Sequence, residues 1–356
     1  MWDVVSLGDL FVDLVPHSRV DGQWLYVPSP GGAPGNVAAG LAKLDHQVIM
    51  VSRVGADAFG KLLTEALLGY GVDVSGIIQS PTERAGLSIV TLDESGDRSF
   101  MFYHDRPADQ HIRAEDIREE WLVQSKILHV GILPLASPTS AAAQRRAMDL
   151  ADANGLPISC DVNFRPSLWQ REEDMLAAGR EVISRSAIVK VSEDELQSVT
   201  GKDDLDAGIQ AMWHDRLEFC SVTRGARGAT LYTPNGRYDC AGFKVGATDT
   251  TGSGDAYTAA VLSGVLNGID PQRLLDMACA AGGLTATRKG AMKSLPTTAE
   301  LAAFVESAGA TRGRPRSRIL DWECRLQLHF LQSPVSACPW QRSHHSHAPR
   351  PDRSTR

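Results

Sequence analysis

Short apolar runs alternate with longer helix-like stretches over most of the chain, and this alternation constrains the fold more than any other feature. The expected strands cover residues 3–8, 48–55, 126–132, 157–163, 187–192, 218–223 and 229–233. The helix-like stretches cover residues 35–44, 58–71, 139–155, 173–185 and 276–288. Continuous apolar strands separated by helices are typical of a parallel sheet covered on both faces. We therefore expect an α/β fold with a central, mainly parallel sheet.

Two segments depart from this alternation. Residues 10–28 and 86–105 have the pattern of hairpin-like strands, and ESGD at 94–97 marks the turn of the second. Both segments lie between α/β units. The simplest architecture is one large domain from which these strands project as a small sheet. Such a sheet could close over a site and exclude water.

Charge separates the chain into two parts. Residues 312–356 contain nine Arg, no Lys and three acidic residues, a net charge of +6, within a total of −7. The remaining residues, 1–311, therefore carry −13, which argues against nucleic acid as a partner. The segment 312–356 is rich in Pro, Arg, Ser and His without a sustained period, and we expect it to be a disordered tail.

The sequence favours a cytoplasmic location. It contains no apolar run of 18 residues, so no membrane span is expected. Its first residues, MWDVVSLGDLFVD, have the pattern of a strand and not of a signal peptide. The six cysteines are scattered without a CxxC pair, which indicates reduced thiols.

The stretch DTTGSGDAY, residues 249–257, combines flexibility, an acid and a helix start. Gly252, Ser253 and Gly254 directly precede Asp255, and an apolar helix-like run follows. Glycines let main-chain N–H groups approach a ligand, and a helix N-terminus favours an anion such as phosphate. Asp255 is then either a helix cap or a base beside the anion site. The second interpretation suits phosphoryl transfer to a hydroxyl group.

Two other glycine-rich stretches open helices. GGAPGNVAAG, residues 31–40, is either a plain loop-to-helix turn with Pro34 near its start or a close backbone approach to a ligand that Asn36 binds. GADAFGKL, residues 55–62, matches seven positions of the P-loop pattern, but Leu62 has no hydroxyl group for Mg²⁺. We therefore interpret the second stretch as helix packing.

Three stretches follow expected strands, where α/β sheets present ligand-binding residues. In DVNFRP, Arg165 either binds a phosphate or lies on the surface. In SEDE, Ser192 and Glu195 form a capping box, which is compatible with Glu195 holding hydrated Mg²⁺. Residues 222–232 form either a simple hairpin or a turn that cups a purine ring.

In this order, the motifs resemble those of the ribokinase-like carbohydrate kinases, the PfkB family. The early signature is similar to GGAPGNVA with VGADAFG downstream, and the late signature is similar to DTTGSGD, about 220 residues later. The resemblance implies a ribokinase-like three-layer α/β/α domain with a small β-sheet lid, spanning residues 1–311. Within the family, DVNFRPSLW and VKVSEDEL are most similar to bacterial fructokinases.

The resemblance also implies roles for single residues. Asp255 would be the general base, and Gly252, Ser253 and Gly254 would form the anion hole. The residues implied in sugar or phosphate contacts are Asp13, Gly32, Asn36, Arg106 and Arg165. The residues implied at the nucleotide site are Ser192, Glu195, Thr223, Gly225 and Gly228. A monovalent-cation loop is matched by Asp249 and by the carbonyl groups of Thr251, Thr285, Arg288, Gly290 and Ser294.

The activity that the resemblance implies is transfer of the γ-phosphate of ATP to a sugar, with Mg²⁺ as cofactor and K⁺ as activator. Fructose is the expected acceptor; ribose, 2-keto-3-deoxygluconate and aminoimidazole riboside are alternatives, as is a non-catalytic sugar-binding protein. Family members are often dimers through the lid, so a homodimer is also expected. At the positions of Arg224 and Cys279 many family members have other residues. Both positions lie where the resemblance implies contacts with the purine ring.

Overall fold

A computed structural model describes residues 1–92, 98–103 and 107–311. The chain divides into two compact units, Met1–Val305 and Glu306–Arg356, and the fold below is that of the first. The predicted tail, 312–356, lies outside the described residues. Within the described part, no helix is long and apolar enough to cross a bilayer.

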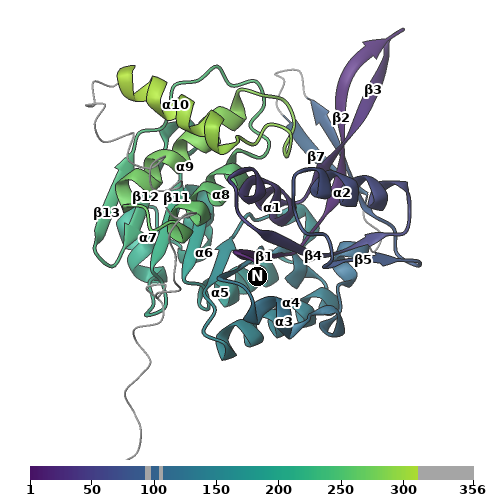
Figure 1. Ribbon diagram of the computed structural model, residues 1–356, viewed down its shortest axis with the longest axis horizontal. Coiled ribbons are helices and arrows are strands. Elements are labelled where there is room, and N and C mark those ends of the chain that lie inside the picture. The colour runs from purple at the N-terminus through teal and green to yellow at the C-terminus, as the bar shows by residue number, and fades with distance from the viewer. Residues whose placement is uncertain (93–97, 104–106, 312–356) are drawn as a thin grey trace, which may run out of the picture. The chain divides into compact units, whose positions relative to one another are not determined.

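A nine-stranded sheet forms the centre of the first unit (Figure 1). In spatial order its strands are β13 (Gly236–Cys240), β12 (Ala229–Thr233), β11 (Phe219–Thr223), β10 (Ile188–Ser192), β9 (Ile158–Asp161), β8 (Ile127–Val130), β1 (Val4–Leu7), β4 (Val48–Gly55) and β5 (Ile77–Ser80). The strands from β11 to β5 pair in parallel, whereas β12 pairs antiparallel with both β11 and β13. The predicted α/β class is confirmed, although β5 and β13 were not expected.

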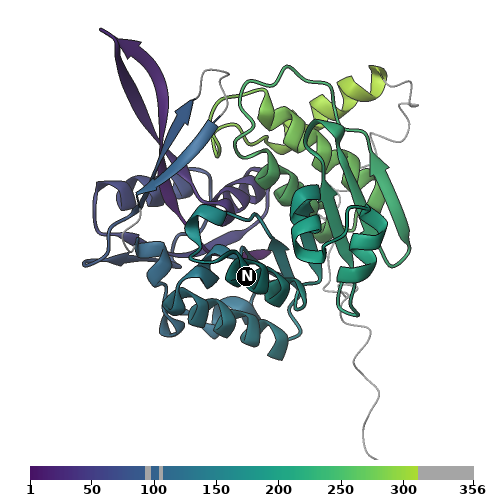
Figure 2. The ribbon, with the colours of Figure 1, turned by 180° about the vertical axis from the view of Figure 1, so that it is seen from behind.

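Helices cover both faces of the sheet, which explains why strands such as β4 and β8 are buried along their whole length. One face is covered by α3 (Glu119–Val123), α4 (Pro138–Ala153), α5 (Glu172–Ile183), α6 (Glu193–Thr200) and α7 (Leu205–Met212). The other is covered by α1 (Ala33–Lys43), α2 (Ala58–Gly69), α8 (Ser253–Leu266) and α9 (Pro271–Ala286). Figure 2 shows the first group from behind. The last helix, α10 (Thr298–Thr311), continues into the second unit.

The two segments that break the alternation form a separate four-stranded sheet, the lid sheet. Its strands, in spatial order, are β3 (Gln23–Gly31), β2 (Phe11–Val20), β6 (Gly86–Leu92) and β7 (Arg98–Tyr103). Asp21 and Gly22 both have positive φ at the tip of β2–β3, the backbone that an Asp-Gly hairpin turn requires. Both hairpins are confirmed, and β2 pairs in parallel with β6 to join them. The predicted turn at 94–97 lies outside the described residues.

The order of the strands reverses between β1 and β8. From β1 the chain proceeds to β4 and β5 on one side, and from β8 to β9 and β10 on the other. Open α/β sheets bind ligands at the carboxyl ends of strands where this reversal occurs. The sheet topology therefore directs attention to the residues that follow β1, β8 and β9.

Candidate active site

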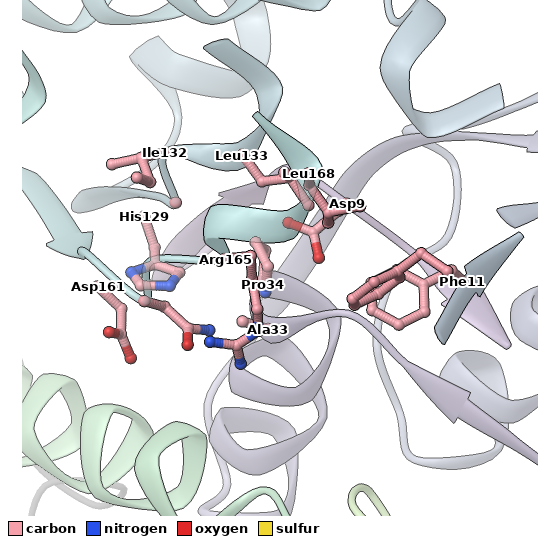
Figure 3. A pocket seen from close by; sticks show the side chains of 13 residues that line it. Asp9, Phe11, Ala33, Pro34, His129, Ile132, Leu133, Asp161, Arg165 and Leu168 are labelled. Atoms are coloured by element: carbon pink, nitrogen blue, oxygen red, sulfur yellow. The ribbon is translucent and has the colours of Figure 1, made fainter. Parts of the chain in front are cut away.

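A pocket lies at this reversal point (Figure 3). It is lined by Asp9, Phe11, Ala33, Pro34, Phe102, His129, Gly131, Ile132, Leu133, Asp161, Asn163, Arg165 and Leu168. In Figure 3, Asp9 and Phe11 lie on one side, His129 and Asp161 on the other, and Arg165 between them. The pocket thus combines an aromatic wall with a few polar groups, the composition of a small-molecule site.

The polar groups of the pocket are strongly affected by burial. Burial raises the pKa of Asp9 to about 6, against the opposing effects of backbone hydrogen bonds and of Arg165. Burial lowers the pKa of His129 to about 3, so its imidazole is neutral and lies 3.1 Å from the Ser159 hydroxyl. Sequence reasoning missed both residues, although Asp9 directly follows a strand and His129 interrupts an apolar one.

Helix α8 begins beside this pocket with the glycine motif. Gly252 adopts φ +81°, which favours glycine, and a Cβ there would lie 3.1 Å from Ala291 Cα. Ser253 Oγ is buried without a hydrogen-bond partner among the described residues. The Ser253 N–H donates to the Thr250 carbonyl at 3.1 Å, so this donor of the predicted anion hole is engaged here.

Asp255 lies in the first turn of α8 and is almost fully buried. Its Oδ2 accepts a hydrogen bond of 2.7 Å from Nδ2 of Asn36 on α1, while Asn36 Oδ1 has no partner among the described atoms. Burial raises the pKa of Asp255 to about 7, and the charge of Asp161 adds to this. The Asn36 hydrogen bond and two cations, Lys190 and Arg165, act in the opposite direction. A carboxyl with such a pKa suits proton transfer near neutral pH.

Three of the residues predicted to hold the sugar line the pocket or lie next to its lining residues in the sequence. Arg165 lines it, and Gly32 and Asn36 lie on either side of its lining residues Ala33 and Pro34. Gly32 has φ +103°, and a Cβ there would meet the Asp9 carbonyl oxygen at 2.4 Å. Asp13 is buried in the lid sheet and accepts a hydrogen bond from Ser88. The remaining predicted residue, Arg106, lies outside the described residues.

The residues predicted at the nucleotide site follow β10 and β11. The capping box is confirmed, because Ser192 Oγ accepts from Glu195 N–H at 3.2 Å and Glu195 Oε2 accepts from Ser192 N–H at 2.7 Å. Glu195 Oε1 also accepts from the N–H of Phe164, which ties the loop after β9 to α6.

The glycine turn after β11 is a tight hairpin. Thr223 ends β11, and Gly225 and Gly228 have positive φ within the turn. A Cβ at Gly228 would meet the Cys240 carbonyl oxygen at 2.0 Å, so only glycine fits there. Arg224 lies partly buried with its guanidinium 3.9 Å from Asp239. The hairpin interpretation is confirmed, and the purine-binding interpretation stays a prediction.

Two residues of the predicted cation loop, Thr251 and Gly290, contact Asp249. Its Oδ1 accepts from Thr251 N–H at 2.9 Å and its Oδ2 from Gly290 N–H at 2.8 Å. Thr285 is fully buried at the end of α9, and Ser294 Oγ donates to the Ala291 carbonyl. The guanidinium group of Arg288 pairs with the carboxylate of Glu300 at 2.8 Å. Two backbone loops thus meet beside the start of α8.

A helix N-terminus and a buried carboxylate beside a pocket at the carboxyl edge of a parallel sheet suit phosphoryl transfer to a hydroxyl group. The sequence profile of the pfkB family carbohydrate kinases matches residues 2–298. The chain belongs to the PfkB family of carbohydrate kinases, as the two signatures predicted.

Relatives of known name agree with this assignment. Fructokinase-1 of Oryza sativa subsp. japonica is 35% identical over 320 residues, which cover 86% of this chain and 98% of that protein. A Vibrio cholerae fructokinase double mutant, solved with fructose, ADP and potassium ion, is 34% identical and superimposes with a TM-score of 0.77. The match covers 86% of this chain and 99% of the Vibrio cholerae chain. A Xylella fastidiosa fructokinase with bound ATP is 28% identical with a TM-score of 0.79, covering 86% and 98%.

Proposed function

We propose that this sugar kinase transfers the γ-phosphate of ATP to fructose and produces fructose 6-phosphate. The observation that carries the proposal is Asp255, a buried carboxyl at the N-terminus of α8 that reaches the pocket's edge through Asn36. The relatives named above include a fructokinase solved with fructose.

Each part of the site has a role in this reaction. Asp255 accepts the proton of the sugar hydroxyl, while the glycine turn at Gly252–Gly254 stabilises the negative charge of the transferring phosphoryl group. Asn36 orients Asp255, and its partnerless Oδ1 offers an acceptor to a sugar hydroxyl. Asp9, Asp13 and Gly32 would bind further sugar hydroxyls.

The metal ions have separate positions in this proposal. Glu195 would hold Mg²⁺ through water, since its carboxylate oxygens already accept backbone N–H groups, and the ion would neutralise phosphate charge. K⁺ would bind the carbonyl groups of the loops that Asp249 joins. The ion would shape the anion hole without taking part in the chemistry.

One alternative has support from a specific observation. The rings of Phe11 and Phe102 meet edge to face with centroids 5.8 Å apart, and both line the pocket. An aromatic wall of this kind can stack against a planar base as well as a sugar face. A riboside such as aminoimidazole riboside is therefore the second candidate acceptor, ahead of ribose and 2-keto-3-deoxygluconate.

The proposal is tested by ADP release from Mg-ATP in the presence of K⁺, with each of these acceptors in turn. A strong response to fructose alone supports the assignment. A response to another acceptor keeps the mechanism and overturns the substrate. No response with any acceptor, even in a chain ending at Thr311, favours a non-catalytic sugar-binding protein.

We also propose a homodimer formed through the lid sheet. Four consecutive apolar residues near the tip of β3, Trp24 to Val27, are 39–48% exposed on both faces of the strand. An edge strand with this composition is prone to pair with another copy. The reduced, buried cysteines Cys160, Cys220, Cys240 and Cys279 suit the proposed cytoplasmic location.

A further inference from the structure

A buried ion pair lies under the start of α8 and was not expected from the sequence. Lys190 Nζ on β10 donates to Asp161 Oδ1 at the end of β9, at 3.0 Å, and both side chains are nearly inaccessible to solvent. Asp161 Oδ2 accepts from the Thr258 hydroxyl on α8, also at 3.0 Å. The hydroxyl group of Thr258 therefore ties the pair to α8.

The pair is placed to act on Asp255. Thr258 follows Asp255 by three residues, so the two side chains lie on the same face of α8. A Cβ on Gly254 would lie 3.5 Å from Lys190 Nζ, which places the ammonium group directly beside the glycine turn. A lysine buried in a strand costs desolvation free energy, and an interior residue that served packing alone would more readily be apolar.

We propose that Lys190 and Asp161 are positioning residues that set the ionisation of Asp255 in the kinase reaction. The inference rests on the function proposed above. Lys190 favours the ionised base and Asp161 disfavours it, so the ionisation of Asp255 depends on two opposing charges. A base balanced in this way is partly ionised at neutral pH and still basic enough to take the sugar proton.

The surrounding charges support this arrangement. The charged groups that face Asp255 are Asp161 from β9, Lys190 from β10 and Arg165 from the loop after β9, while α1 contributes the neutral amide of Asn36. Burial lowers the pKa of Lys190, but the carboxylates of Asp161, Glu195 and Asp255 outweigh it and leave the pKa raised. Lys190 therefore stays charged throughout the working pH range.

The test compares Lys190→Met with Asp161→Asn in the full-length chain. The Asp255 carboxyl is titrated by ¹³C NMR, with its signal assigned from Asp255→Asn, and the pH dependence of kcat is measured alongside. An opposite charge within about 4–6 Å shifts a pKa by about 1–3 units, so Lys190→Met should raise the pKa of Asp255 by at least about one unit. Asp161→Asn should lower it, and the acidic limb of the kcat profile should move in the same directions.

Two further variants keep the test decisive. Breaking a buried ion pair can unfold a protein, so the neutral pair Lys190→Met with Asp161→Asn is measured too and should titrate close to wild type. Lys126→Met is the control, because it removes an ion pair of 2.7 Å with Asp3 at the opposite end of the strands. It should leave the pKa of Asp255 unchanged.

The outcomes separate this inference from the proposed function. Opposite NMR shifts in an inactive protein would support the charge pair and reject the kinase reaction. Shifts in the same direction in both variants, or in neither, would overturn the inference even if the protein phosphorylates fructose.

Discussion

At the scale of single residues, Asp255 shows how position changes the chemistry of a carboxyl group. A carboxylate in the first turn of a helix normally gains from the helix dipole. Burial of Asp255, together with the nearby charge of Asp161, instead raises its pKa to about 7. A residue that could have been a simple cap therefore has the ionisation behaviour of a general base.

We expect Asp255→Asn to abolish most turnover without loss of structure. Asn keeps the shape of the side chain but cannot accept the proton, and general base catalysis is typically worth about 10²–10⁴-fold. Steady-state kcat with fructose and ATP measures the effect, with ATP binding by calorimetry as the check on folding. Near-normal kcat in a folded variant would remove Asp255 from this role.

The pKa of Asp255 also predicts how activity depends on pH. Because the base must be ionised, kcat of the wild type should fall as the pH drops through about 7. An acidic limb centred well below pH 6 would contradict this prediction.

Stability should show the opposite dependence on pH. The folded chain holds the Asp255 proton up to about pH 7, whereas the unfolded chain releases it near 3.8, so stability falls as the pH rises between these values. Asp255→Asn should therefore raise Tm at pH 8 and change it little at pH 4. A lower Tm at pH 8 would show that the ionised carboxylate stabilises the fold.

At the scale of elements, the end of α1 is joined to the loop beside the anion hole by one lysine. Lys43 Nζ donates to the carbonyl oxygens of Met292, Lys293 and Leu295, at 3.2, 3.4 and 2.7 Å. The three donors of one ammonium group match three carbonyl acceptors of the loop. The helix that carries Asn36 and the loop that borders Gly252 are thus held together.

Lys43→Met should destabilise this connection by about 1–3 kcal/mol, because the carbonyl groups lose a charged donor in a half-buried place. Chemical denaturation measures the change in the free energy of unfolding. Lys61→Met on α2 is the matched control, since Lys61 forms an exposed pair with Glu65 and its loss should have little effect. Equal effects of the two substitutions would show that the three hydrogen bonds contribute nothing.

At the scale of the whole molecule, we expect a second copy of the chain to cover the exposed apolar end of β3 in the lid sheet. We expect the wild type to be a dimer in light scattering, and Leu25→Glu to convert it to a monomer, because a buried charge at the interface is costly. Leu68→Glu is the control, since Leu68 is also exposed but lies on α2 and not on a strand of the lid sheet. A monomeric wild type would refute the proposal.

The segment beyond Thr311 should be dispensable for the kinase. The compact unit ends at Val305, and the family profile ends at residue 298. A chain ending at Thr311 should keep the kcat and Tm of the full-length protein. A large loss of either would show that residues 312–356 stabilise the catalytic unit.

Local patterns determined much of this protein. Apolar periodicity predicted the parallel sheet, the Asp-Gly turn belonged to a predicted hairpin, and the spacing of Ser192 and Glu195 predicted a capping box, because each depends on neighbours in the chain. The two glycine signatures identified the family for the same reason. Strands β5 and β13 were missed because they lie at the edges of the sheet and are only partly buried, so they lack the continuous apolar run of the inner strands.

Only the tertiary structure decided which distant side chains meet. Nothing in the sequence places Asn36 beside Asp255, 219 residues later, or Lys190 between Asp161 and the start of α8. Parallel strands bring residues far apart in the chain to one edge of the sheet, and burial there changes their pKa values. The sequence therefore determined the elements and the family, and the assembled sheet decided the electrostatics on which the proposed chemistry depends.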